Sequence, residues 1–289
     1  MTPRLTTRAT RFWELNKAGR LLLPNAWDAA SARVFEEAGF PAIGTTSAGI
    51  AYAEGLQDAE HIRRDAMVSA IARIASAVSI PVTADIEGGY GAGACDVAET
   101  VEAVLDAGAV GINLEDANHY GGAASLIGVD EQCERIAAAR EVANRRGSPF
   151  VINARTDTFL RQLGADVDER VATTADRGSR YLRAGADLVF VPLLIDACVI
   201  ARLVSPLGGQ ISVMALPGAP PASDLFAAGV ARVSIGQMGM LAALGTLRNV
   251  ASELIQHGTW RSIERTFYGF GEAEALFASR TREAARTVL

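Results

Sequence analysis

The chain is poor in cysteine, and its cysteines are not arranged for chemistry. Only three occur in 289 residues, and they stand far apart, at Cys95, Cys133 and Cys198. No two of them form the Cys-x-x-Cys spacing that zinc sites and redox-active pairs use. An odd number of scattered cysteines also argues against a disulfide framework. We therefore expect reduced thiols in a cytoplasmic protein.

Long apolar runs and clusters of positive charge are missing too. The apolar stretch Leu21–Leu23 is interrupted by Pro24, far short of the roughly 20 residues that a membrane-spanning helix needs. Residues 1–20 are polar and rich in arginine and threonine, without the apolar core of a signal peptide. The formal net charge is −6 and no long Lys/Arg run occurs, so neither nucleic acid nor a membrane is expected as a partner.

What the chain does contain is a repeated unit of a helical stretch, a glycine and an apolar strand. The unit occurs at 37–43, 106–112, 183–189 and 227–233, with the glycine where the helix would end. Such recurrence is typical of alternating α/β chains. Eight apolar stretches are expected to form a parallel sheet that is covered on both faces: Leu21–Trp27, Ala42–Ala48, Pro81–Glu87, Gly111–Asp116, Phe150–Thr156, Leu188–Leu194, Ile211–Leu216 and Arg232–Gly236.

Eight such units, with no linker rich in Pro, Gly or Ser between them, predict one (β/α)8 barrel of the TIM type with extra C-terminal helices. The expected limits are an N-terminal segment over 1–20, the barrel over 21–245 and a C-terminal helical extension over 246–289. More helix follows the last strand than a barrel needs. We expect this extension to pack on a neighbouring subunit or to be exchanged with it in a homo-oligomer.

Acidic residues stand at the ends of two neighbouring strands. Asp85 and Glu87 are two positions apart and so point to the same side of a strand, and Glu115 ends the next strand. Converging carboxylates repel each other, and Mg2+ or Mn2+, bound directly or through water, would relieve the repulsion. The alternative is that these acids cap helices or pair with basic residues. Asp116 has the opposite strand parity and is expected to orient a neighbour.

Two further groups of residues lie at the same predicted end of the sheet. Arg155 can hold a substrate carboxylate or a developing oxyanion with its fork of N–H donors. A buried salt bridge to Asp157 or Glu115 is the alternative for this arginine. Residues 46–49 combine hydroxyl-bearing and small side chains, and their backbone N–H groups can bind an anion, although a plain turn is the alternative.

His119 lies in the loop directly after the acids of the fourth strand. A lone loop histidine is usually just exposed, but this position makes it, with Asn118 and Tyr120, a candidate for proton transfer. The stretch 89–94 matches the dinucleotide-binding pattern G-x-G-x-x-A. Two carboxylates stand directly before it and would repel a pyrophosphate, so we do not interpret it as a nucleotide site.

Six short phrases, in a specific order and spacing, connect the chain with a known family. They are Pro24–Asp28, Thr46–Ala51, Gly55–Asp58, Asp85–Gly91, Asn113–Asp116 and Asn153–Asp157. In these phrases the chain resembles the isocitrate lyase/phosphoenolpyruvate mutase superfamily, from about residue 21 to beyond residue 236. The resemblance implies a Mg2+-dependent barrel that acts on a 2-oxo acid or enolpyruvate, usually as a tetramer with an exchanged C-terminal helix.

The resemblance also implies roles for single residues. Asp85 looks like the direct metal ligand, Glu87 stands where the family usually has aspartate, and Glu115 looks like a metal partner that acts through water. Arg155 resembles the arginine that holds the substrate oxygens, Asp58 resembles an acid behind the metal ligands, and residues 46–48 occupy the segment that binds the substrate carboxylate. Together with the residues chosen for their position, the candidate catalytic residues are Arg155, His119 and Asn118, and the candidate substrate-binding residues are Trp27, Thr46, Ser47, Ala48, Asp58 and Arg155. The implied reaction forms an enolate as a C–C or C–P bond breaks.

The chain departs from the family pattern where the known lyases carry their acid. Their Lys-[Lys/Arg]-Cys-Gly-His loop has no counterpart, because residues 117–125 contain no cysteine. Phe190–Leu193 stands in the region of their strand-six glutamate, and Val213–Gly218 replaces their Asn-x-Thr-Glu-Phe-Gly phrase. The mutase loop, with a lysine before Asn-Ser, is matched only by Asn118. Ordinary isocitrate lyase activity is therefore not expected.

The expected function is a Mg2+-dependent carbon–carbon lyase, working by aldol-type cleavage or decarboxylation. Its substrate would be a small 2-oxo or hydroxy carboxylic acid, and the reaction would pass through a pyruvate-like enolate. Two alternatives stay open: a phosphonomutase or C–P bond hydrolase, and a non-catalytic protein that binds 2-oxo acids.

Overall fold

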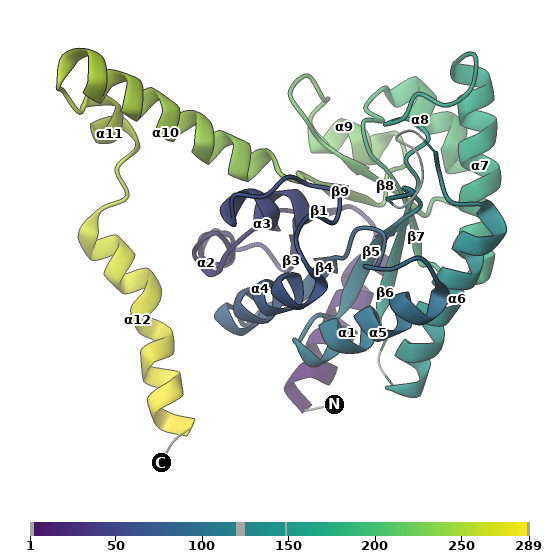
Figure 1. Cartoon of the computed structure of the whole chain (residues 1–289), viewed down its shortest axis with the longest axis horizontal. Coiled ribbons are helices and arrows are strands. Elements are labelled where there is room, and N and C mark those ends of the chain that lie inside the picture. Colours follow the sequence, from purple (N-terminus) through teal and green to yellow (C-terminus); the bar gives the residue numbers. More distant parts are fainter. Residues whose placement is uncertain (1–2, 120–124, 148, 288–289) are drawn as a thin grey trace.

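The computed structural model describes residues 3–119, 125–147 and 149–287 and contains one parallel sheet of nine strands. The sheet curls into a nearly closed barrel with helices around it (Figure 1). The strands follow one another around the barrel in chain order: β1 (Leu21–Leu23), β2 (Asn25–Ala26), β3 (Ile43–Thr45), β4 (Val82–Asp85), β5 (Gly111–Glu115), β6 (Val151–Arg155), β7 (Leu188–Val191), β8 (Ile211–Met214) and β9 (Arg232–Ser234). The predicted barrel with extra C-terminal helices is confirmed.

The first predicted strand is two short strands, because Pro24 interrupts it. Proline has no N–H to donate, so the sheet pairing changes partner at this position. Before it, β1 pairs with β9, and after it, β2 pairs with β3. The carbonyl of Pro24 still accepts a hydrogen bond from the N–H of Gly44, at 2.9 Å. One stretch of chain thus joins both edges of the sheet.

The second predicted strand, Ala42–Ala48, is also shorter than expected. It ends at Thr45, because Thr46 caps the following helix: its side-chain oxygen accepts a hydrogen bond from the N–H of Gly49 at 3.3 Å. Helix α3 (Ser47–Ala53) begins at once. The hydroxyl-bearing residues at this strand end therefore belong to a helix N-terminus, where free N–H groups point outward.

The remaining helices of the outer layer lie between successive strands. They are α2 (Ala29–Glu37), α4 (Arg64–Ala77), α5 (Ala94–Asp106), α6 (Val129–Arg145), α7 (Val167–Ala184), α8 (Ala197–Val204) and α9 (Ala222–Ala227).

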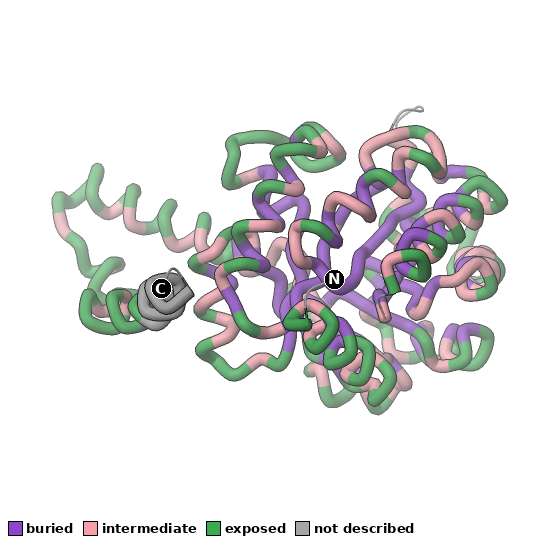
Figure 2. The backbone as a smooth tube through the Cα atoms, turned by 90° about the horizontal axis from the view of Figure 1, so that it is seen from below, coloured by how far each residue is buried: buried purple, intermediate pink, exposed green. Residues whose placement is uncertain are grey.

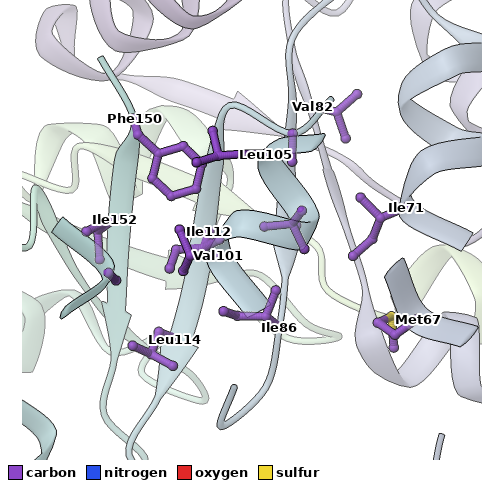
Figure 3. Packing of buried hydrophobic residues seen from close by; sticks show 14 of the residues in the cluster. Met67, Ile71, Val82, Ile86, Val101, Leu105, Ile112, Leu114, Phe150 and Ile152 are labelled. Atoms are coloured by element: carbon purple, nitrogen blue, oxygen red, sulfur yellow. The ribbon is translucent and has the colours of Figure 1, made fainter. Parts of the chain in front are cut away.

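Alternate residues of a strand point either to the hydrophobic core between sheet and helices or to the interior of the barrel. Ile112 and Leu114 of β5 point outward and pack with Val101 and Leu105 of α5 in the main hydrophobic cluster (Figure 3). All four side chains are buried. Successive residues of a strand point to opposite faces. Packing of the even-numbered positions on the helices therefore directs the odd-numbered positions 113 and 115 into the barrel.

The predicted N-terminal segment 1–20 contains helix α1 (Pro3–Ala18), which packs against strand residues at the amino-terminal end of the barrel. Ala9 and Phe12 of this helix have no exposed surface. The ring of Phe12 lies 5.9 Å from the guanidinium carbon of Arg232, which points into the barrel from β9. Helix α1 therefore closes the end of the barrel opposite to the strand termini that carry the acids.

Three helices follow the last strand: α10 (Met238–His257), α11 (Arg261–Thr266) and α12 (Phe270–Thr287). Helix α10 leads away from the barrel (Figures 1 and 2), and α12 returns to α2, where Nε of Arg33 donates to the carbonyl of Leu276 at 3.2 Å. We call these three helices the arm. Helix α10 runs through the boundary expected at residue 245, so the arm continues the helix that starts beside the last strand. In the part of the chain that the structure describes, no helix is long and apolar enough to cross a membrane.

We predict that Phe12→Ala destabilises the whole barrel. Removing a fully buried phenylalanine costs about 3–5 kcal/mol, from lost burial and the cavity left behind. Trp13→Ala is the matched control, because Trp13 lies on the same helix and is 37% exposed. Urea unfolding followed by circular dichroism measures both variants. Equal losses for the two would show that α1 is not part of the barrel core.

Candidate active site

A cavity of about 200 Å3 opens at the carboxyl ends of the strands, where barrel enzymes place their active sites. It is lined by residues from almost every unit of the barrel: Asn25, Thr46, Ser47, Ala48, Asp58, Asp85, Asn113, Arg155, Leu160, Phe190, Pro192, Leu193, Met214, Ser234, Gly236 and Gln237. Its volume suits a ligand of a few non-hydrogen atoms.

A second cavity, of about 340 Å3, lies at the opposite end of the barrel beside α1. Its wall includes Trp13, Lys17 and Gln210. The acid in that wall, Asp187, is already paired with Arg140 at 2.5 Å. We therefore place the candidate active site in the smaller cavity, where carboxylates and a guanidinium converge.

Asp85 ends β4 and is held by the start of α3. Its Oδ2 accepts hydrogen bonds from the N–H of Ser47 at 3.1 Å and from the hydroxyl of Ser47 at 2.9 Å. The N–H of Asp85 donates to the hydroxyl of Thr45 at 2.9 Å. The carboxylate thus has a fixed position in the cavity wall, next to the free N–H groups of a helix N-terminus.

Arg155, the last residue of β6, is fixed by two acids. Its Nε and Nη2 donate to the two carboxylate oxygens of Asp157, at 2.6 and 3.0 Å. Its Nη1 lies 2.5 Å from Oε2 of Glu115, which β5 holds directly opposite. Burial alone would lower the pKa of Arg155, but the charges of Asp157 and Glu115 raise it well above the usual value. The guanidinium therefore stays charged.

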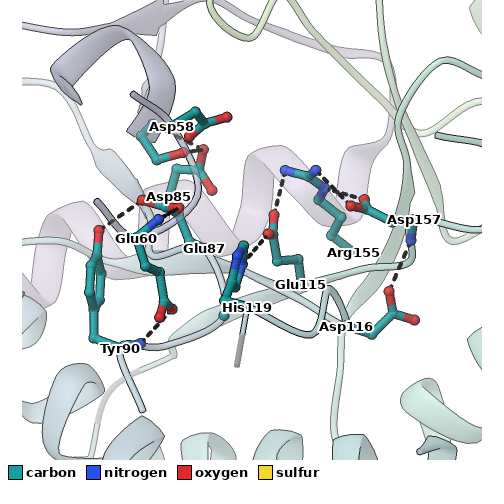
Figure 4. A network of polar contacts seen from close by, with 12 residues as sticks. Asp58, Glu60, Asp85, Glu87, Tyr90, Glu115, Asp116, His119, Arg155 and Asp157 are labelled. Carbon is teal, nitrogen blue, oxygen red and sulfur yellow. Dashed lines mark hydrogen bonds and ion pairs between the residues drawn. The ribbon is translucent and has the colours of Figure 1, made fainter. Parts of the chain in front are cut away.

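Asp116 points the other way from Glu115 and supports this arrangement from behind (Figure 4). Its Oδ1 accepts a hydrogen bond from the N–H of Asp157 at 2.9 Å. Its Oδ2 accepts from the hydroxyl of Tyr181 at 2.7 Å and from Nε of Arg177 at 2.9 Å. Asp116 therefore orients the segment that carries Asp157, and it does so with partners from α7.

Glu87 sits in a strained loop and is engaged by neighbouring groups. Its backbone φ is +51°, a left-handed value that few non-glycine residues adopt. Its carboxylate accepts from the N–H of Glu60 at 2.5 Å and from the hydroxyl of Tyr90 at 3.0 Å. Burial, with the nearby charges of Asp58 and Glu115, raises the pKa of Glu87 to about 8.

The glycine loop after Glu87 is anchored through its carbonyl groups. Thr100 of α5 donates its hydroxyl to the carbonyl of Gly89 at 2.8 Å, and Arg135 of α6 donates to the carbonyl of Gly88. A side chain at Gly88 would collide with His119, at 2.8 Å. The glycines therefore let this loop pack directly against the histidine.

His119 contacts Glu115 and not the solvent. Its Nε2 lies 2.7 Å from Oε1 of Glu115, and only 8% of its side chain is exposed. Burial would lower the pKa of His119, but the hydrogen bond and charge of Glu115 raise it above the usual value. The N–H of Asn118 donates to the carbonyl of Ser125 at 3.2 Å. Tyr120, the third proton-transfer candidate, lies outside the described residues.

The donors in this region are oxygens, the kind that Mg2+ prefers. Within the described ranges, no three His, Cys, Asp or Glu side chains are grouped so that they alone could hold a metal ion. Asp85 lines the cavity, whereas Glu87 and Glu115 do not line it and are engaged as described. Mg2+ commonly binds through one or two carboxylates and keeps several waters, and the residues fit a site of that kind.

Most predicted substrate-binding residues line the same cavity, with one exception. Thr46, Ser47, Ala48, Asp58 and Arg155 are in its wall. Trp27 is not; its side chain packs against Gly49 and Gly239, where an added Cβ would lie 3.0 Å from it in each case.

Sequence reasoning did not find several residues that hold the site. Among them are Glu60 and Tyr90 beside Glu87, and Arg177 and Tyr181 behind Asp116. Arg177 and Tyr181 are four positions apart on α7, so they lie on the same face of that helix. This spacing is the sequence signal that could have identified them.

Comparison with known proteins places the chain among enzymes of one family. A family model described as phosphoenolpyruvate phosphomutase matches residues 12–255. An uncharacterised protein of Mycobacterium tuberculosis H37Rv is 37% identical over 246 residues, which cover 83% of this chain and 88% of that protein. The 2-methylisocitrate lyase of Escherichia coli K12 is 28% identical over 262 residues, covering 86% and 84%.

Solved structures share the whole fold. A Burkholderia cenocepacia J2315 protein, named only provisionally as a lyase/mutase, is 35% identical, with a TM-score of 0.87 and 96% and 98% of the two chains covered. Phosphonopyruvate hydrolase, solved with oxalate and Mg2+, is 26% identical, with a TM-score of 0.81 and 97% and 98% covered. This chain belongs to the phosphoenolpyruvate phosphomutase family, within the isocitrate lyase/phosphoenolpyruvate mutase superfamily of lyases, hydrolases and mutases.

Proposed function

We propose that this protein is a Mg2+-dependent carbon–carbon lyase that cleaves a small 2-oxo or hydroxy carboxylic acid through a pyruvate-like enolate. The observation that carries the proposal is the single small cavity into which Asp85, Arg155 and the start of α3 converge. A carboxylate that can take a metal ion, a fixed guanidinium and free N–H groups are together what an enolate with a neighbouring carboxylate requires.

The proposed binding roles follow from these positions. Asp85 would hold Mg2+ directly, and Glu87 and Glu115 would act on its waters. Bound Mg2+ would supply a Lewis acid for negative charge that develops on the substrate oxygens. Arg155 would contact the same oxygens, and the N–H of Ala48 would hold the substrate carboxylate, because the N–H of Ser47 is already donated to Asp85.

Proton transfer is assigned to His119, with Glu115 and Asn118 beside it. The hydrogen bond to Glu115 orients the imidazole ring and favours its charged form. The neutral imidazole can take a proton from a substrate hydroxyl, and the imidazolium so formed, which Glu115 stabilises, can return that proton to the enolate carbon. It would thereby stand in for the cysteine loop that the chain lacks.

The solved relative that carries oxalate and Mg2+ supports a small carboxylate ligand for this site as well. Oxalate resembles the enolate of pyruvate in shape and charge. Its binding therefore tests the proposed Mg2+ site without knowledge of the substrate.

We expect oxalate to bind only in the presence of Mg2+, and Asp85→Asn to weaken this binding by at least about tenfold, because a ligand charge is lost. Isothermal titration calorimetry with and without EDTA measures the effect. Asp65→Asn is the control, since Asp65 is an exposed carboxylate paired with Arg63. Oxalate binding that is indifferent to both Mg2+ and Asp85 would refute the metal site.

We further expect release of pyruvate from one or more members of a panel of pyruvate aldols and alkylmalates. Coupling to lactate dehydrogenase measures the release. Arg155→Lys should lower kcat by about 10²–10³-fold, because lysine lacks the fork that contacts two oxygens. Arg202→Lys, at an exposed arginine paired with Asp168, is the control.

Two other results would replace the lyase assignment. A new phosphorus NMR signal from phosphonopyruvate, without pyruvate release from the carbon substrates, would favour the C–P hydrolase or mutase. Mg2+-dependent oxalate binding with no turnover of either class, unchanged by substitution of His119, would favour a non-catalytic binder.

The arm formed by α10, α11 and α12 is proposed as the contact with other subunits of a homo-oligomer, a tetramer or a dimer. It exposes large apolar side chains along its length: Leu241, Leu244, Leu247, Leu254, Ile255, Trp260, Ile263, Phe267, Tyr268, Phe270 and Phe277. An apolar surface of this extent on a soluble protein is typical of an interaction site. Residues 246–289 would then be exchanged between subunits.

The double variant Ile255→Asp, Phe270→Asp should dissociate this oligomer, because charges would be buried in an apolar contact. These side chains are 86% and 82% exposed in the chain itself, so folding of the barrel should be unaffected. Analytical ultracentrifugation gives the mass, and circular dichroism checks the fold. The control is Gln256→Asp, at a neighbouring exposed position of α10. A monomeric native protein would contradict the proposal.

A further inference from the structure

The cavity has two chemically different halves. The ends of β3 to β6 contribute hydroxyls, carboxylates and the guanidinium, and uncharged polar groups come from β2 and from the end of β9 at Asn25, Ser234 and Gln237. The other half is apolar and comes from the loop after β6, from β7 and its loop, and from the end of β8: Leu160, Phe190, Pro192, Leu193 and Met214. A ligand that fills the cavity must therefore be polar at one end and apolar at the other.

The charges of the residues that line the cavity can balance only one anionic group of a bound ligand. Among the described residues that line the cavity, Arg155 is the single basic one, and it already faces Glu115 and Asp157. Two acids, Asp58 and Asp85, line the same wall. With both ionised and one divalent cation bound, the lining carries a single excess positive charge. A second carboxylate or a phosphonate at the apolar end would have no cation to pair with, and burying it there is costly.

In the adjoining loop the one group that can carry a positive charge is His119, which is already paired with Glu115. Residues 117–128 contain neither lysine nor arginine. The apolar wall also carries features of a binding surface. Leu160 and Leu193 are 38% and 42% exposed at this cavity, and Leu193 has a φ of +60°, a conformation that is strained for a leucine.

We propose that the substrate is a 2-oxo acid with one charged end whose departing fragment is an uncharged alkyl aldehyde, namely a 4-hydroxy-2-oxo acid with an alkyl substituent at C4. This inference rests on the proposed lyase function and specifies its substrate class. The carboxylate and the 2-oxo group occupy the polar half, and the alkyl group lies against Phe190, Pro192 and Leu193.

The reaction is a retro-aldol cleavage. The C4 hydroxyl gives its proton to a base, for which the pair of His119 and Glu115 is the candidate, and the C4 oxygen becomes an aldehyde carbonyl. The C3–C4 bond breaks, and its electron pair remains on C3 as the enolate of pyruvate. Addition of one proton to C3 gives pyruvate, so the products are pyruvate and an alkyl aldehyde, with no oxidant or reductant required.

The test compares two ligands of nearly the same shape. In 4-methyl-2-oxopentanoate an isopropyl group takes the place of the second carboxylate of oxaloacetate, while the 2-oxo acid end is identical. Calorimetry with Mg2+ should show at least about tenfold tighter binding of 4-methyl-2-oxopentanoate, because the second carboxylate of oxaloacetate would be buried against apolar side chains without a cation. Pyruvate aldols with a C4 methyl or ethyl group should release pyruvate faster than 4-hydroxy-2-oxoglutarate.

A charge introduced into the apolar wall should reverse the preference. Leu160→Arg is expected to raise the affinity for oxaloacetate and to lower that for 4-methyl-2-oxopentanoate. Val167→Arg adds the same charge at an exposed position outside the cavity and should change neither. Equal or tighter binding of oxaloacetate by the native protein overturns the inference but leaves Mg2+-dependent oxalate binding intact. Loss of that oxalate binding would instead defeat the proposed function.

Discussion

The buried guanidinium of Arg155 is the constraint on which the rest of the site depends. A charge taken out of water needs partners of opposite sign, and this one has a carboxylate on each side, from Glu115 and Asp157. Those acids need support in turn, which Asp116 supplies by holding the N–H of Asp157. Removing one partner of such a buried pair costs about 3–5 kcal/mol, so the residues behave as one unit.

The strand register of the barrel brings the residues of this unit together. Register between β5 and β6 puts Glu115 directly opposite Arg155, and the same register pairs Asn113 with Asn153 one step deeper. The outward residues of these strands pack on helices and thereby decide which residues face inward. Packing on the outer face of the sheet thus determines which charged residues point into the barrel. The loop after Glu87 packs directly against His119, because Gly88 has no side chain that would displace the imidazole ring.

Much of this could be predicted from the sequence, for reasons that are local. Strand parity identifies Asp85 and Glu115 as inward residues and Asp116 as an outward one, and repeated helix–glycine–strand units identify the barrel. The two readings of Arg155, substrate contact and buried salt bridge, could not be separated, because one residue can make both contacts. The break of the first strand at Pro24 was also predictable in principle, since the proline was visible.

What escaped prediction depends on contacts between distant parts of the chain. Tyr181 reaches Asp116 across 65 positions, and no periodic pattern in the sequence reports such a pairing. Trp27 is a candidate substrate contact by its place at the end of the first predicted strand, but its Cβ packs against Gly49 and its ring against Gly239. Long-range side-chain geometry decides each of these cases.

The start of α10 joins the cavity to the arm. Gly236 and Gln237 line the cavity, and α10 begins at the next residue, with Gly239 packed on the ring of Trp27. A ligand that orders this corner therefore also orders the first turn of the helix that carries the exposed apolar surface. In the proposed homo-oligomer, ligand affinity and self-association would then be thermodynamically linked, and each would strengthen the other by the same factor. The concentration of the protein would become one of the variables that set the occupancy of its site.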